Sequence, residues 1–294
     1  MKTNIITKIS LATLAFAGFI GTACSSDDEQ KSTATLTLAA TKKNYDSGTR
    51  AISYVNPSDP TKGITTTWAT TDKVAVYSSG WAGKIGDLSP MEGKTEGNKT
   101  KLDGNVSPDN LKIGERTELI FPRTTWSYAD QDGTLATISS KYDYAIASAQ
   151  VTFIDQNNKI YASDAMFVTQ QAIVRYIIKY GDNPLNVNSM TIVAASGKLV
   201  KSRTLDGTSV EYGGLEIKPA SATNVLDVAI RNDFKEGDKY TLTVKAGDKI
   251  YSSTSKNAHT YAWGKLIIHE VDVNFVDDTH TERDTYQYQG IEEW

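Results

Sequence analysis

The residue with the clearest chemistry in this sequence is Cys24, the only cysteine among 294 residues. It directly follows Gly21-Thr22-Ala23, which closes an apolar run that begins at Ile9. Lysines precede this run, and a basic start, a short apolar stretch and small residues at its end are typical of a secretory signal. The run is too short for a membrane span, which needs ~20 apolar residues. A thiol at such a cleavage point is the acyl acceptor of a bacterial lipoprotein signal. The sequence therefore predicts a signal peptide over 1–23 and a lipid on Cys24.

Cys24 is followed, after two serines, by the acidic run Asp27-Asp28-Glu29. This run resembles the surface-export signal of Bacteroidetes lipoproteins, and the resemblance implies a chain on the outer face of the outer membrane, held there by its lipid. Charge runs are also typical of solvated tethers, so a plain tether is the alternative. For Cys24 itself, the alternative is a free thiol behind an ordinary cleaved signal.

The composition excludes several function classes. The net charge is -4 and the pI is near 5.5, so a nucleic-acid partner is not expected. A single cysteine allows no disulfide within the chain and no thiolate metal site. The sequence has only three histidines, so it offers few candidates for histidine-based catalysis.

No local pattern carries catalysis. A G-x-S-x-G elbow is absent from the sequence, and the one cysteine is assigned to lipid. His269 falls on the apolar face of a predicted strand, where a hydrogen-bonded core histidine is the favoured interpretation. The oxygen-rich segment 277–284 could hold Ca²⁺, but it lacks the spacing of an EF-hand loop, so a solvated acidic turn is favoured. Trp81 and Trp126 could stack on sugars, although a core position is favoured. The sequence thus predicts a protein that is not an enzyme and has no cofactor.

The elements that must position these residues are β-strands. Threonine, serine, tyrosine, valine and isoleucine are plentiful, and turn residues recur at short intervals. Alternating apolar positions predict strands over 32–41, 66–77, 118–122, 151–154, 173–180, 189–195, 215–218, 225–231, 240–245 and 265–276. Residues 42–48 look like a turn, and 78–108 is expected to hold short extended pieces at best. In the last strand, Ile267, Val271, Val273 and Phe275 are expected to share one face. The fold class is all-β, of the β-sandwich kind.

The order of several short motifs resembles the fimbrillin family of Bacteroidetes, the subunits of type V pili. The motifs run along nearly the whole chain: Thr49-Arg50-Ala51, Trp68 followed by 72–77 (D-K-V-A-V-Y), Tyr142-Asp143-Tyr144-Ala145, 261–265 (Y-A-W-G-K) and 290–294 (G-I-E-E-W). Thr71 departs from the pattern, because the family has a glycine at this position.

This resemblance implies two transthyretin-like β-sandwich domains in tandem, over 51–181 and 182–294, behind a lipidated tether and removable strand over 24–50. It also implies that an arginine-specific protease cuts between Arg50 and Ala51. The strand that contains Leu36 and Leu38 is then lost, and an extended segment of a neighbouring subunit takes its place. The sequence offers the C-terminal segment, with the aromatic residues Tyr286, Tyr288 and Trp294, as a donor strand. Pairing of this segment within its own domain is the alternative.

The sequence therefore supports a structural subunit or adhesin of a surface pilus, located on the outer membrane or in the fimbrium. Its expected partners are other pilus subunits, the outer membrane through Cys24, and glycans or proteins of host or bacterial surfaces. A monomeric surface lipoprotein that binds glycans is the alternative, and exposed coplanar tryptophans would favour it. A β-sandwich hydrolase is a third interpretation and requires two facing carboxylates.

Overall fold

The computed structural model describes residues 33–43, 53–54, 56, 58–59, 64–81, 83–233 and 237–276. These residues form an all-β structure, as the sequence predicts, with short helical turns between strands. The turns are η2 (Ser79–Trp81), η3 (Pro108–Asn110), α1 (Leu135–Thr137) and η4 (Ile138–Tyr142). No helix in the described part of the chain has the length and apolar character needed to cross a membrane.

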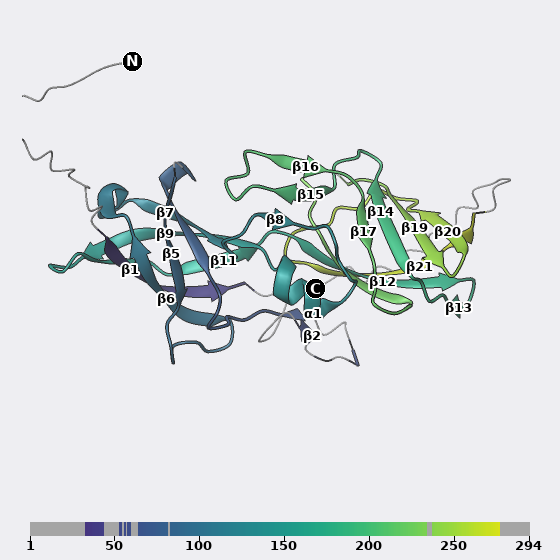
Figure 1. Cartoon of the computed structure of the whole chain (residues 1–294), viewed down its shortest axis with the longest axis horizontal. Coiled ribbons are helices and arrows are strands. Elements are labelled where there is room, and N and C mark those ends of the chain that lie inside the picture. Colours follow the sequence, from purple (N-terminus) through teal and green to yellow (C-terminus); the bar gives the residue numbers. More distant parts are fainter. Residues whose placement is uncertain are drawn as a thin grey trace, which may run out of the picture. The chain divides into compact units, whose positions relative to one another are not determined.

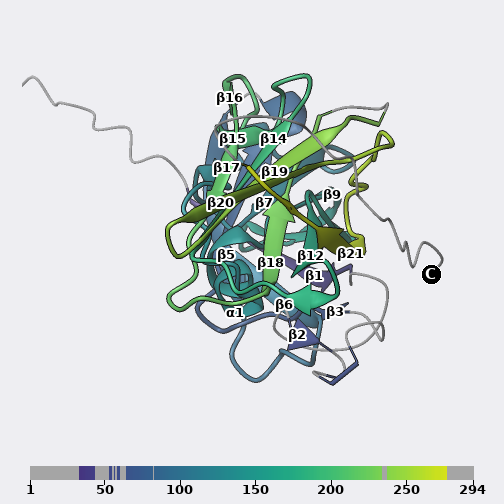
Figure 2. The ribbon, with the colours of Figure 1, turned by 90° about the vertical axis from the view of Figure 1, so that its right-hand side faces the viewer.

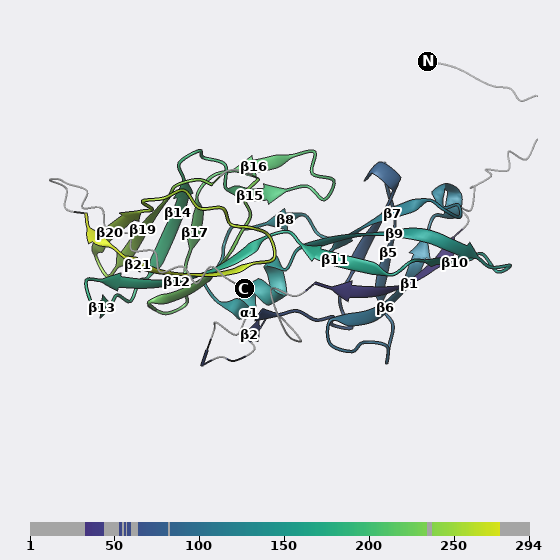
Figure 3. The ribbon, with the colours of Figure 1, turned by 180° about the vertical axis from the view of Figure 1, so that it is seen from behind.

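The largest sheet has eight strands in the order β10-β1-β11-β9-β7-β4-β5-β6. A further pairing joins β1 to β6, so hydrogen bonds run from strand to strand around a closed circuit. Figures 1 and 3 show β1 between β6 and the β11 side of the sheet. The strands are β1 (Ala34–Lys42), β4 (Val74–Ser78), β5 (Lys84–Pro90), β6 (Lys99–Val106), β7 (Arg116–Phe121), β9 (Ala145–Ile154), β10 (Lys159–Ala162) and β11 (Ala165–Thr169).

The eight-stranded sheet encloses its own apolar core, to which nearly every strand contributes alternate side chains. Trp68 lies in this core with 1% of its surface exposed and packs edge-on against Phe121 and Phe167. The other large buried members are Leu36, Leu38, Val74, Val76, Leu88, Leu102, Leu119 and Ile160.

The expectation of little regular structure over 78–108 is wrong, because β5 and β6 lie there and pair with each other. The two strands approach so closely that only glycine fits at the contact. A Cβ on Gly104 would lie 2.1 Å from the carbonyl oxygen of Asp87, and one on Gly86 would lie 2.3 Å from that of Asn105. From sequence alone, these glycines look like turn residues, although they serve a close strand contact.

Gly104→Ala is therefore expected to lower the free energy of unfolding by about 1–3 kcal/mol, because the added methyl group must push two backbones apart. Gly83→Ala is the matched control, since a Cβ there would meet nothing within 4 Å. Urea unfolding of both variants measures the difference. Equal midpoints for the two variants would show that the β5–β6 contact tolerates a methyl group at Gly104.

The second half of the described chain forms two larger sheets. One contains β12 (Ala172–Tyr180), β13 (Asn183–Pro184), β18 (Val225–Ile230) and β21 (Leu266–Asp272). The other has five strands in the order β17 (Leu215–Ile217), β14 (Ser189–Ala194), β19 (Tyr240–Ala246), β20 (Lys249–Thr254) and β22 (Asn274–Phe275). Smaller pairings join β2 (Ser53–Tyr54) to β3 (Ile64–Thr65), and β15 (Val200–Arg203) to both β16 (Val210–Tyr212) and β8 (Trp126–Ser127).

These two sheets share one apolar core. In the view of Figure 2, β14, β19 and β20 lie above β12, β18 and β21, and buried side chains of both groups belong to one cluster. Val174 and Tyr176 of β12 are fully buried in it, as are Ile192 of β14 and Leu242 of β19. Two sheets that bury facing apolar sides in this way form a sandwich-like arrangement.

The long strand expected over 265–276 is two strands in different sheets. β21 pairs in parallel with β12, whereas β22 pairs with β20. Between them, the N–H of Val273 donates to the carbonyl of Lys179, 2.9 Å away. Val271 and Val273 are buried as expected, but Phe275 is 45% exposed, so its predicted place on their apolar face is wrong. The change of sheet breaks the alternation on which that prediction rested.

Candidate functional site

β1 is the element on which the predicted function depends, and its sequence explains its position. The run A-T-L-T-L-A-A-T-K alternates along its whole length, with Ala34, Leu36, Leu38, Ala40 and Lys42 buried and the residues between them half-buried. Leu36 is 0% exposed and Leu38 is 3% exposed. The strand predicted close behind the tether is therefore present, and its even-numbered side chains form part of the core.

Both edges of β1 are paired. One edge runs antiparallel to β6 from Ala34↔Val106 to Thr41↔Lys99. The other edge runs parallel to β10 near its start and parallel to β11 near its end. We call the space that β1 fills between these strands the β1 slot. An empty slot would expose apolar side chains and two rows of unpaired backbone groups, which is a template for another strand.

The last residue of β1 is a buried lysine. Lys42 is 4% exposed, and its ammonium nitrogen lies 2.7 Å from the backbone carbonyl oxygen of Thr67. The same nitrogen lies 3.2 Å from Oδ2 of Asp72 and 3.6 Å from Oδ2 of Asp143. The expectation that Lys42 starts a turn is wrong at this residue, because it continues the alternation of β1 into the core.

Aromatic rings complete the surroundings of this ammonium group. Lys42 Nζ lies 3.6 Å from the ring centroid of Phe121 and 4.5 Å from that of Trp68. Both distances fall within the range of cation–π attraction, which strengthens where water is excluded. We call Thr67, Trp68, Asp72, Phe121 and Asp143 the Lys42 pocket.

In the Lys42 pocket, one ammonium group faces two carboxyl groups. Asp143 is 7% exposed, and its burial raises the pKa of its carboxyl group above the ordinary value. Lys42 acts in the opposite direction, and the neighbouring Asp72 raises the pKa of Asp143 further. Lys42 is thus the group that favours the charged form of Asp143.

A second ionic cluster joins residues that are distant in sequence. Arg175 of β12 donates two hydrogen bonds to Asp227 of β18, both 2.9 Å long. The hydroxyl of Tyr54 donates to the same carboxylate over 2.6 Å, and the guanidinium group lies 4.1 Å from the Tyr54 ring centroid. Burial, followed by the negative charge of Asp227, raises the pKa of Tyr54. The bidentate pair links β12 to β18, and the hydrogen bond and ring contact of Tyr54 hold β2 beside them.

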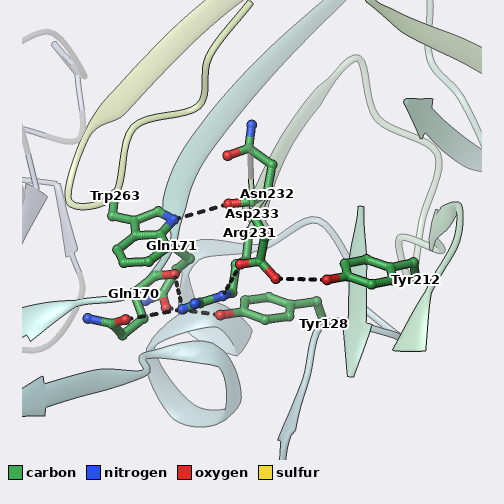
Figure 4. Close-up of polar contacts among 8 residues, drawn as sticks. All are labelled: Tyr128, Gln170, Gln171, Tyr212, Arg231, Asn232, Asp233 and Trp263. Atoms are coloured by element: carbon green, nitrogen blue, oxygen red, sulfur yellow. Dashed lines mark hydrogen bonds and ion pairs between the residues drawn. The ribbon is translucent and has the colours of Figure 1, made fainter. Parts of the chain in front are cut away.

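A third cluster surrounds Arg231, which is 4% exposed (Figure 4). Its Nε donates to Asp233, and its Nη1 donates to the backbone and side-chain oxygens of Gln170, each over 3.1 Å. Its guanidinium carbon lies 4.3 Å from the ring centroid of Trp263. Tyr212 donates to the other oxygen of Asp233 over 3.3 Å. The donors of Arg231 are thus directed at internal acceptors, as expected for a structural cluster.

The three tryptophans whose side chains the structure describes do not form the platform that would favour sugar binding. Trp68 and Trp126 are buried with 1% and 0% of their surfaces exposed, which confirms the core interpretation of Trp126. Trp263 is 43% exposed, and Arg231 lies against its ring. The side chains of Trp81 and Trp294 lie outside the described part of the structure.

His269 is buried, as predicted, with 1% of its surface exposed. Burial lowers its pKa to about 3, and the nearby His259 acts in the same direction. The two imidazole rings lie 5.4 Å apart between centroids. A histidine that stays neutral in a closed core does not suit proton transfer at neutral pH.

The structure places two of the predicted site residues, Leu36 and Leu38, in the core side of β1. The other predicted site residues lie outside the described residues; they are Cys24, Arg50, Ala51, Tyr286, Tyr288 and Trp294. The oxygen-rich segment 277–284 also lies outside them. Within the described part, no group of three or more histidine, cysteine, aspartate or glutamate residues is arranged to hold a metal ion.

Sequence reasoning missed the Lys42 pocket. The available signal was the position of Lys42, which continues the even-numbered series of β1. Asp72 and Asp143 both lie within motifs of the family resemblance, but nothing in the sequence connects them to Lys42.

No protein-family model matches the chain, and no curated protein matches it either. Several solved structures are similar to it. One is a candidate cell adhesion protein from Bacteroides ovatus, with 13% identity, a TM-score of 0.43, and 88% of this chain and 99% of that chain covered. Another is the tip fimbrial protein Mfa3 of Porphyromonas gingivalis with a C-terminal truncation, with 10% identity, a TM-score of 0.40, and 83% and 99% covered. The chain resembles fimbrial and cell adhesion proteins.

A third similar structure is a candidate polysaccharide-binding protein from Bacteroides thetaiotaomicron, with 12% identity, a TM-score of 0.37, and 83% of this chain and 99% of that chain covered. At such identities and TM-scores, the similarity assigns no role to any residue of this chain.

Proposed function

We propose that this chain is a structural subunit or adhesin of a cell-surface type V pilus, assembled by donor-strand exchange. The observation that carries the proposal is the position of β1. It is the first described strand, it is paired on both edges, and it fills the apolar core with alternate side chains. Removal of such a strand leaves a slot that accepts another extended segment with the same alternation.

Processing near Arg50 is the step that would free the slot. Arg50 follows β1 in the sequence, so a cut between Arg50 and Ala51 separates β1 from every other strand of the described structure. Backbone hydrogen bonds, core packing and the contacts of Lys42 would then hold β1 in place without a covalent link. A strand from a neighbouring subunit replaces these bonds and buries its own apolar side chains in the core.

We further propose two transthyretin-like β-sandwich domains in tandem. The pairing of β12 with β18 and β21 supports a boundary before Ala172, earlier than residue 181. β8 is an exception to a clean division, because it pairs with β15 of the second half.

The proposed location is the cell surface, where the precursor is held on the outer membrane by a lipid on Cys24. The sequence carries the lipid prediction, and the adhesion and fimbrial neighbours are compatible with a surface location. A glycan-binding surface lipoprotein is the alternative account of a chain that keeps its lipid and stays monomeric.

Intact mass and N-terminal sequencing of the protein sheared from its native cell surface test the proposal. We expect an N-terminus at Ala51 and a ladder of high-mass species that survives mild heating in detergent. An acylated Cys24 on a monomer would contradict polymerisation and would favour the alternative.

Two variants sharpen this experiment. Arg50→Ala should leave the precursor uncut and monomeric, because the proposed cleavage site is lost. Arg123→Ala is the matched control, since the Arg123 side chain is 47% exposed and lies outside the proposed site. Normal processing of the Arg50→Ala protein would exclude this position as the cleavage site.

A further inference from the structure

Lys42 and the acidic groups of its pocket lie on different parts of the chain, one on the removable strand and the others on the rest of the protein. Lys42 belongs to β1, whereas Thr67, Asp72 and Asp143 belong to the part that remains after a cut at Arg50. The loss of β1 would therefore remove the cation and leave both carboxylates in place.

The two carboxylates limit which strand can replace β1. The side chains of Asp72 and Asp143 are 17% and 8% exposed while β1 is bound. A new strand that fills the slot as β1 does would cover them to a similar extent. The backbone N–H of Ala69 also donates to Asp72, over 2.9 Å. If the new strand placed an apolar or acidic side chain at this position, the two acidic groups would be covered without a cation, and buried negative charge without a counter-charge is unfavourable.

We infer that the β1 slot selects a strand with lysine or arginine at the position of Lys42. This inference rests on the proposed exchange of β1. The occupant is an extended segment of another subunit that runs antiparallel to β6, with apolar residues at alternate positions and a cation two residues after the last of them. The backbone pairing accepts many sequences, and the Lys42 pocket then discriminates among them by charge.

The chain's own C-terminal segment does not match this description. Residues 286–294 read Y-Q-Y-Q-G-I-E-E-W, with two glutamates and no lysine or arginine. In a second copy of this chain, the segment would bring negative charge toward Asp72 and Asp143. The inference therefore excludes residues 286–294 of an identical subunit as the strand that fills the slot.

Strand exchange on the nicked full-length protein tests the inference. A specific protease site inserted between Lys43 and Arg50 allows the folded chain to be cut while β1 stays bound. Fluorescent peptides of the sequence 34–43 are then added in excess, and their incorporation is followed by anisotropy and native mass.

We expect the Lys42→Gln peptide to bind about tenfold more weakly than the parent peptide, because it leaves buried negative charge without a counter-charge. The Lys42→Arg peptide should bind nearly as well as the parent peptide. A Thr41→Gln peptide is the matched control, because Thr41 lies on the half-buried face of β1. The unlabelled parent peptide should displace the parent and the Thr41→Gln peptides alike.

Asp72→Asn combined with Asp143→Asn in the nicked protein should remove most of the preference for lysine over glutamine. Equal binding of the Lys42→Gln and parent peptides to the unaltered nicked protein would overturn the inference and leave strand exchange intact. Tight binding of a peptide of sequence 286–294 would also overturn it. No exchange with any peptide would instead contradict the proposed function itself, and the inference with it.

Discussion

A protein that carries Leu36→Ala and Leu38→Ala is expected to lose a large part of its stability. Both side chains are almost fully buried in the core of the eight-stranded sheet. Truncation of a buried leucine typically costs about 2–5 kcal/mol, and neighbouring truncations do not add fully. We therefore expect a combined loss of about 4–8 kcal/mol, against a typical total stability of about 5–15 kcal/mol.

Urea unfolding, followed by the fluorescence of tryptophans such as the buried Trp68, measures this loss. The matched control is Thr35→Ala with Thr37→Ala, on the half-buried face of the same strand. That pair should cost far less, because its side chains contribute little to the core. Equal losses for the two double variants would show that the slot does not depend on apolar side chains.

The second large effect is a loss of folding stability at acidic pH. His269 has a pKa of about 3 in the folded protein because burial disfavours its charged form. An unfolded histidine has a pKa near ~6.5. Between these values the unfolded chain binds more protons than the folded chain, so the free energy of unfolding falls as the pH decreases. From pH 6.5 to 4.5, this one residue should remove roughly 2–3 kcal/mol.

Urea unfolding at several pH values in this window tests the prediction, because most carboxylates still remain charged there. His269→Gln should show a much flatter dependence of stability on pH, since the neutral amide has nothing to titrate. His259→Gln is the comparison, and it should retain most of the dependence, because burial is the main cause of the low pKa of His269. An unchanged slope for His269→Gln would assign the acid sensitivity to other groups.

The alternation of apolar and polar residues along the sequence predicted much of the fold. The all-β class, β1 and most strands of the second half could be predicted because their apolar residues repeat with a period of two. The β5–β6 pair could not, since Gly86 and Gly104 are present for a close contact that only the folded sheet reveals.

The site was less accessible to sequence reasoning. Lys42 looked like a turn residue because lysine is rarely buried without a partner. Its partners Asp72 and Asp143 lie 30 or more positions away in the sequence. Only the folded structure brings one cation and two carboxylates together beneath aromatic rings. The family resemblance pointed to β1 as the functional strand, but it gave no reason for a charge at its end.

The closed circuit of the eight-stranded sheet also affects the order in which its strands fold. β1 is the first described strand, yet its Leu36 pairs with Ile160, about 120 positions later in the sequence. Such distant pairings form slowly, because closing a long loop costs conformational entropy before any contact forms. Hairpins such as β4–β5 and β9–β10 join strands that are adjacent in the sequence, so they form faster. We expect the strand made first to dock last. A protease that releases β1 would thus reverse the final step of folding and leave the earlier steps in place.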